Sequence, residues 1–167
     1  MSDDELWHLA YGEKWPALIE HLGKLDVGEV NKQILFQNNG SGFCVSMWAA
    51  YGNAPAPVWK ALIEAALRVG LDLQAILTRV DKYNNNTVLH YAAEYSGDEV
   101  CCCVCFLCPL ALDMKNNENM TPLERAKAYN RPSSLVAALT QAVDDRAGFL
   151  KQQLEVRRGN TDTQTTV

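Results

Sequence analysis

The stretch TVLHYAA at residues 87–93 decides the fold of this chain, because the chain repeats it. Thirty-four residues later, TPLERA at residues 121–126 keeps the threonine, the leucine and the alanine in the same positions. Nearer the N-terminus, WPALIE at residues 15–20 returns forty-four residues later as WKALIE at residues 59–64. Such periods indicate a repeat protein, in which each copy is one supersecondary unit. The sequence therefore predicts four imperfect copies, at about residues 4–36, 37–80, 81–114 and 115–143.

Each copy is expected to fold as a pair of helices. The second helices carry apolar residues at helical spacing, as Val58, Leu62 and Ala66 do on one face. Glycine, asparagine or proline follows each short first helix and is a typical helix stop. No alternation of apolar and polar residues favours a sheet, so the predicted fold class is all-α. The predicted first helices span residues 6–11, 43–51, 88–95 and 122–129.

Turn-forming stretches and a C-terminal helix complete the predicted architecture. The turns lie at residues 37–42 (QNNGSG), 81–86 (DKYNNN) and 115–119 (KNNEN), where asparagine tolerates the left-handed backbone of a turn. The connection 24–36 has room for an extra helix. Apolar residues recurring from Leu139 to Leu154 predict a helix to about residue 158, which closes a repeat domain spanning 1–158. The last nine residues, 159–167, lack apolar anchors, and we expect a flexible tail.

These features resemble the ankyrin repeat family. TVLHYAA is similar to the TPLHxAA signature of that family, and residues 112–121 resemble the turn that precedes it. Asn85 and Asn119 stand where the family has a turn glycine. The resemblance covers roughly residues 4–143 and implies short turn fingers followed by helix pairs, stacked into a solenoid that binds other proteins. One helical pair cannot bury its own apolar face, whereas three or four stacked pairs form a continuous core.

The resemblance also implies where a partner protein binds, at the turn tips and on the concave face formed by the first helices. In addition, a tyrosine ends each predicted first helix, and tyrosine is favoured at binding hot spots. These tyrosines either form an exposed stripe for a partner or pack against neighbouring copies. The candidate partner-binding residues are Tyr11, Tyr51, Tyr83, Asn84, Asn86, Glu94, Tyr95, Asn117, Glu118, Met120 and Tyr129.

Five of the six cysteines lie between Cys101 and Cys108, in the string CCCVCFLC. Thiolates at such spacings hold zinc or iron–sulfur clusters in other proteins. In the repeat register, however, the string is the second helix of the third copy, with Val104 and Cys108 on its buried face. We therefore expect no metal and interpret these cysteines mainly as small hydrophobic residues. The alternative is a thiol-based redox sensor or a metal-binding protein using Cys102 and Cys105, on the outer side.

Other chemistry has little support in the sequence. His90 occupies the signature position, where the family resemblance implies a hydrogen bond that ties a turn to a helix. No nucleophile or carboxylate forms a catalytic pattern with His8, His21 or His90, so we expect neither an enzyme nor a cofactor. The net charge of −5, from 15 basic and 20 acidic residues, disfavours nucleic-acid binding.

Location and the C-terminus give two further expectations. The acidic start MSDDE lacks a secretion signal, and the longest apolar run, residues 100–112, is too short for a membrane span of about 20 residues. We expect a cytoplasmic or nuclear protein with reduced cysteines. The ending TTV fits the pattern that PDZ domains capture, with Thr165 and Val167 as the contacts.

Overall fold

The computed structural model describes the backbone of residues 4–162 and the side chains of residues 4–148, and this part of the chain is all-helical, as predicted. No strand occurs in it. The helices are α1 (Glu5–Tyr11), α2 (Trp15–Lys24), α3 (Val27–Leu35), α4 (Val45–Tyr51), α5 (Ala56–Arg68), α6 (Leu73–Leu77), α7 (Val88–Tyr95), α8 (Asp98–Leu107), the 3-10 helix η1 (Pro109–Asp113), α9 (Pro122–Ala128) and α10 (Ser133–Asp162).

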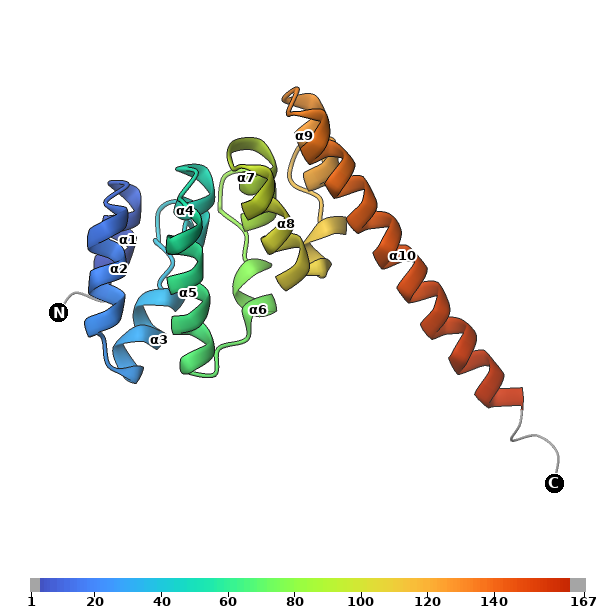
Figure 1. Ribbon diagram of the computed structural model, residues 1–167, viewed down its shortest axis with the longest axis horizontal. Coiled ribbons are helices and arrows are strands. Elements are labelled where there is room, and N and C mark those ends of the chain that lie inside the picture. Colours follow the sequence, from blue (N-terminus) through green and yellow to red (C-terminus); the bar gives the residue numbers. More distant parts are fainter. Residues whose placement is uncertain (1–3, 163–167) are drawn as a thin grey trace.

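The helices follow one another as pairs that lie side by side in chain order (Figure 1). The first helices α1, α4, α7 and α9 contact one another in sequence, and the second helices α2, α5, α8 and α10 form a neighbouring row. All four predicted first helices occur within two residues of their expected bounds. The predicted extra helix is α3, whereas α6 and η1 were not predicted. Helix α10 ends at Asp162, beyond the predicted 158, and the rest of the tail, with Thr165 and Val167, lies outside the described residues.

The repeated threonine explains where two of the first helices begin. Thr87 caps α7: its Oγ1 accepts a bond from the backbone N of His90 (3.4 Å), and Nδ1 of His90 accepts one from the backbone N of Thr87 (3.1 Å). Thr121 and Glu124 make the same reciprocal pair at the start of α9, at 3.3 and 2.7 Å. This capping box satisfies two of the free N–H groups at a helix start. The Thr-x-x-His and Thr-x-x-Glu patterns are therefore local signals for helix initiation.

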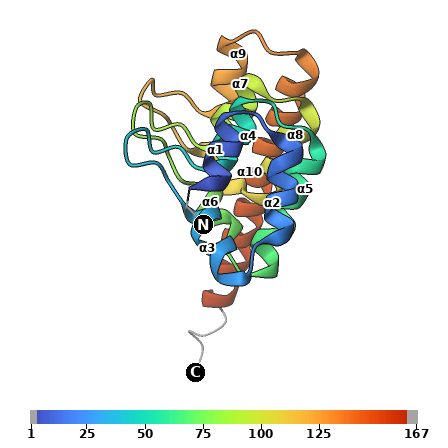
Figure 2. The same ribbon diagram turned by 90° about the vertical axis from the view of Figure 1, so that its left-hand side faces the viewer.

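Three turns project together from one side of the helix rows (Figure 2). We call them the first, second and third fingers, comprising residues 37–44, 80–87 and 115–121. In each finger one side-chain oxygen accepts hydrogen bonds from two backbone N–H groups. The acceptors are Asn38, Asp81 and Asn116 in the first, second and third fingers. Such turns fix the loop backbone without a sheet.

Each finger also contains one residue with a left-handed backbone. Asn85 (φ 53°) and Asn119 (φ 60°) stand at the predicted turn positions, and Gly42 (φ 76°) is their counterpart in the first finger. A Cβ atom on Gly42 would lie 2.8 Å from the backbone N of Lys82, so only glycine fits where the first two fingers meet. The use of asparagine in place of turn glycine is thus confirmed at both predicted positions.

One continuous core runs through the rows of helices. Leu6, Met47 and Leu89 from three first helices are fully buried, as are Leu135 and Leu139 near the start of α10. Burying a side chain of this size contributes about 1.5–3 kcal/mol. The core thus extends from the first helix pair to the last.

Candidate partner-binding surface

Every first helix carries two planar side chains about one turn apart, the second at or next to its C-terminal end. Positions three or four residues apart share one face of a helix, so both members of a pair face the same way. We call these eight residues the ladder and each pair one rung. In each pair the first residue along the chain is the inner member and the tyrosine that follows it is the outer member. The pairs are Trp7 and Tyr11, Trp48 and Tyr51, Tyr91 and Tyr95, and Arg125 and Tyr129.

The rings of the ladder touch from α1 to α7. Tyr11 stacks on Trp7, with centroids 5.3 Å apart, and meets the edge of Trp48 at 4.9 Å. Tyr51 lies 5.6 Å from Trp48 and 4.6 Å from Tyr95 on the next first helix. Stacked and edge-to-face pairs in this range contribute about 0.5–1.5 kcal/mol each beyond the burial of their area. The row of rings therefore links three first helices.

An arginine takes the inner position in the fourth pair. The guanidinium carbon of Arg125 lies 5.0 Å from the centroid of the Tyr129 ring. Its nitrogens bond to the carboxylates of Glu94 and of Glu118, the latter at 3.0 Å. Arg125 and Glu94 are both buried. The last rung is thus a cation–π contact that is anchored to the third pair through an ion pair.

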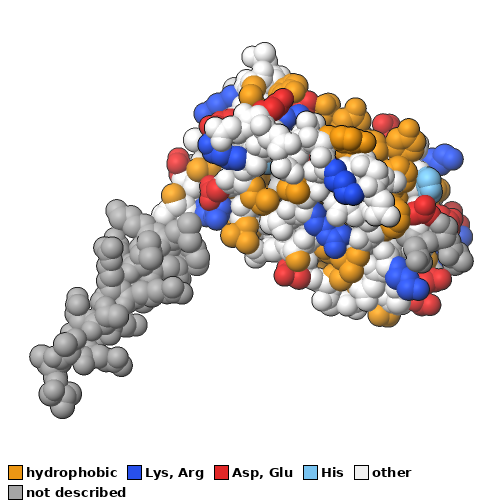
Figure 3. Space-filling view, turned by 180° about the vertical axis from the view of Figure 1, so that it is seen from behind, with side chains coloured by type: hydrophobic (Ala, Val, Ile, Leu, Met, Phe, Trp, Pro, Cys, Tyr) orange, Lys and Arg blue, Asp and Glu red, His pale blue; other side chains and the backbone are white. Residues whose placement is uncertain are grey.

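The outer tyrosines remain accessible, although three of them also contact a neighbouring pair. The exposed fractions are 59% for Tyr11, 43% for Tyr51, 37% for Tyr95 and 48% for Tyr129. Figure 3 shows hydrophobic side chains gathered along the upper margin of the molecule as seen from behind. All four tyrosines are exposed, and Tyr11, Tyr51 and Tyr95 also pack against a neighbouring pair, so the two alternatives drawn from the sequence do not exclude each other.

The tips of the second and third fingers are joined by hydrogen bonds. Asn117 donates from its backbone N to the carbonyl of Asn84 (2.8 Å) and from Nδ2 to the carbonyl of Tyr83 (2.9 Å). Asn85 Nδ2 donates to the side-chain oxygen of Asn117 (2.6 Å). Tyr83 is 66% exposed. The predicted tip residues Tyr83, Asn84 and Asn117 therefore lie together at the surface.

Glu118 and Met120 of the third finger are also partly or fully accessible, whereas two other predicted contacts are not. Asn86 is fully buried, and its side-chain oxygen accepts a bond from Nδ2 of Asn116 (2.9 Å). Glu94 is buried as well, and its carboxylate forms an ion pair with Arg125. Both predictions of direct partner contact are wrong, because these polar groups join one copy to the next.

The cysteine cluster is mostly interior. Cys101, Cys105 and Cys108 are buried, Cys103 is half-buried and Cys102 is exposed. The prediction that Cys105 lies on the outer side is wrong, because α10 packs against α8 there. Partial desolvation nevertheless raises the pKa of the exposed Cys102 thiol. In the described part of the chain, no three histidine, cysteine or acidic residues are placed to hold a metal ion.

The buried histidines join separate elements. His90 Nε2 lies 3.0 Å from the carbonyl oxygen of Met120, so α7 is tied to the third finger, as the family resemblance implied. Burial lowers the pKa of His90 to about 4, which keeps the ring neutral at pH 7. His21 Nε2 contacts the side-chain oxygen of Gln33 (3.0 Å), which also accepts a bond from the backbone N of Leu6. These rings act as structural bridges.

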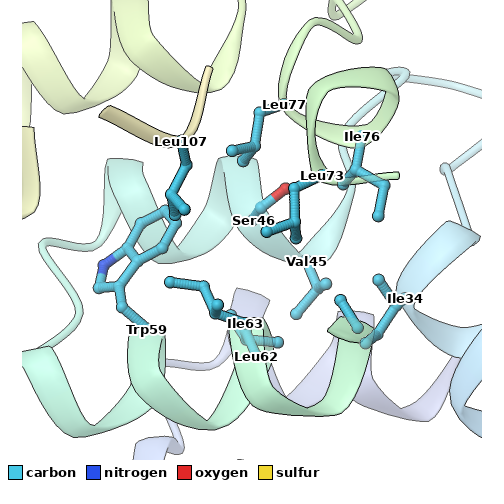
Figure 4. A pocket seen from close by; sticks show the side chains of 11 residues that line it. Ile34, Val45, Ser46, Trp59, Leu62, Ile63, Leu73, Ile76, Leu77 and Leu107 are labelled. Atoms are coloured by element: carbon cyan, nitrogen blue, oxygen red, sulfur yellow. The ribbon is translucent and has the colours of Figure 1, made fainter. Parts of the chain in front are cut away.

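Two hollows beside α5 are lined mainly by apolar side chains, although Lys60, Glu64 and Glu99 also line the wider one. Figure 4 shows a cavity of about 30 Å³, lined by Ile34, Trp59, Leu73 and other apolar side chains, with Ser46 as the one polar residue. A wider groove of about 710 Å³ runs between α5 and α8, past Val100.

No protein-family model matches this chain, and no curated protein does. None of the helices within residues 4–162 combines the length and the apolar character that a membrane span requires.

Proposed function

We propose that this chain is a non-catalytic protein-binding module of the ankyrin type, whose helix pairs stack as a solenoid. The repeated features support this proposal: a finger with a left-handed turn residue precedes α4, α7 and α9, a threonine caps α7 and α9, and a second helix packs behind each first helix. Contacts within each row also run from one pair to the next. The concave face would then be the ladder together with the adjacent fingers.

The ladder is the observation that carries the proposal. It offers four exposed tyrosine rings on one row of helices, and large stiff aromatic side chains dominate binding hot spots. Its rings and the interlocked finger tips are already held in place by contacts between copies. A surface fixed before binding loses little conformational entropy when a partner docks. The arrangement is suited to recognising a protein surface.

The proposal is tested by affinity capture from cell extract with the purified chain and a ladder variant, Tyr51→Ala with Tyr95→Ala. We expect the variant to lose the specifically captured protein by tenfold or more, since about 1.4 kcal/mol corresponds to tenfold in affinity. A matched control removes two exposed apolar side chains from second helices, Leu67→Ala with Phe106→Ala. Capture that survives in the ladder variant, or that disappears only in the control, contradicts the proposal.

A further inference from the structure

The composition of the ladder points to the chemistry of its partner. Resting on the proposed function above, we infer that the ladder binds a protein segment that presents arginine side chains, with each guanidinium stacked on the exposed rings of the outer tyrosines. Three features of the described residues carry this inference: the arginine already built into the ladder, the accessible rings beside it, and the acidic charge of the chain.

The built-in arginine shows that the ladder accepts a guanidinium in place of a ring. Trp7 and Tyr91 each stack on the outer tyrosine of their own helix, with interplanar angles of 10° and 23°. In the fourth pair the Arg125 guanidinium holds the equivalent position against Tyr129. A guanidinium is planar and weakly hydrated, so it stacks on aromatic faces where a lysine ammonium does not. The fourth rung is therefore an internal example of the proposed contact.

The third and second pairs leave rings for a guanidinium from outside. Tyr51 and Tyr95 form a corner, with ring centroids 4.6 Å apart and planes inclined by 51°. Both rings are more than a third exposed. A cation within about 6 Å of a ring centroid is attracted by the ring quadrupole. This corner is the place where an incoming arginine would contact two rings at once.

The charge of the chain favours a cationic ligand over an anionic one. The net charge is −5, and the carboxylate of Glu118 beside the last rung is half exposed while it bonds to Arg125. Oppositely charged surfaces steer association and disfavour partners of the wrong sign.

The test uses calorimetric titration of the full chain with a blocked glycine–serine peptide that carries three arginines. The comparison peptide carries citrulline, which has the same shape without the charge. We expect the arginine peptide to bind about tenfold tighter. We also expect Tyr51→Leu with Tyr95→Leu to reduce binding of the arginine peptide by about tenfold, since each cation–π contact contributes roughly a two- to thirtyfold difference.

The variants distinguish stacking of arginine on the tyrosine rings from long-range electrostatic attraction to the whole chain. Tyrosine-to-leucine changes leave the net charge unaltered at pH 7, so a loss of binding cannot come from weaker long-range electrostatics. Tyr51→Phe with Tyr95→Phe keeps the rings and should bind within about twofold of the wild type. Phe106→Leu, which removes an exposed ring from the second helix α8 outside the ladder and the fingers, is the matched control and should bind normally.

Two outcomes overturn the inference: equal binding of the citrulline peptide by the wild-type chain, or undiminished binding by the leucine variant. The first needs no variant and so does not depend on how well a variant folds. If arginine is not preferred while protein capture still depends on the ladder, the inference is wrong and the proposed function stands. If capture does not depend on the ladder, the proposed function fails whatever the peptides do.

Discussion

His90 shows how one side chain joins two repeats. Its Nδ1 accepts a hydrogen bond from the backbone N of Thr87, so Nε2 must carry the proton and donate it to the carbonyl of Met120. The neutral ring alone can make both bonds, because a protonated ring has no acceptor. Burial lowers the pKa of His90 to about 4, because the charged form of the ring is poorly solvated there, and so favours this neutral form. The helix cap and the bond to the next finger therefore depend together on a neutral ring.

The stability of the fold should consequently fall in acid. The unfolded chain takes up a proton at His90 near pH 6.5, whereas the folded chain does so only near pH 4. The contribution is complete above pH 6.5 and is lost as the pH falls to 4, a change of roughly 3 kcal/mol. Urea unfolding between pH 7.5 and 4.5 measures it, with His90→Gln as the comparison. Parallel pH dependence of the two proteins would contradict this assignment.

The buried ion pair of Arg125 and Glu94 is a second residue that spans two copies. Arg125→Met leaves the Glu94 carboxylate buried without its partner, and we expect the free energy of unfolding to drop by about 3–5 kcal/mol. Changing both, Arg125→Met with Glu94→Leu, should restore most of this loss, because no lone charge stays buried. Urea unfolding of the two single variants and the double variant measures the coupling free energy between the two side chains. Strictly additive losses would show that the pair is not coupled.

At the scale of the elements, the fingers and first helices were the most predictable parts of the chain. Their signals are local: a capping threonine, a turn asparagine and an apolar stripe all act within a few residues. The short helices α6 and η1 were missed, because they lie in connections where tertiary packing determines the backbone. The inner members of the ladder were missed as well, although each stands one helical turn before a tyrosine that was recognised.

The left-handed asparagine of the third finger allows a direct test of this local reasoning. Asn119→Gly should leave stability within about 0.5 kcal/mol of the wild type, whereas Asn119→Ala should cost about 1–2 kcal/mol at φ 60°. Thermal unfolding measures both changes. Asn84→Ala, at an exposed finger position without a positive φ, is the matched control and should be neutral. Equal effects of glycine and alanine at position 119 would refute the role of the backbone angle.

Helix α10 supplies the last part of the core. It contacts α8, α9 and η1, and Leu139 is almost fully buried there. Leu139→Ala should reduce the free energy of unfolding by about 2–5 kcal/mol through lost burial and the cavity it leaves. The exposed neighbour Gln141→Ala should change it by no more than about 0.5 kcal/mol. Similar losses for the two variants, measured in urea, would show that α10 does not close the core.

For the whole molecule, contacts between copies decided what sequence reasoning could and could not predict. The order of units followed from the repeats, because each copy carries the same local signals. The burial of Asn86 and Glu94 could not be predicted in this way, because their partners lie some thirty residues away in the next copy. These partners are Asn116 and Arg125. The exposure of Cys105 was predicted wrongly for a related reason. Helix α10 covers a face of α8 that would be exposed to solvent if the third helix pair stood alone.

The central claim is that a protein partner docks on the ladder, and site-specific photo-crosslinking tests it most directly. A photoreactive phenylalanine analogue replaces Tyr51 in one protein and Leu67, an exposed residue of the second helix α5, in another. After irradiation in cell extract, we expect a discrete crosslinked product from position 51 and none of comparable yield from position 67. Crosslinking from position 67 alone, or equally from both positions, would contradict the account.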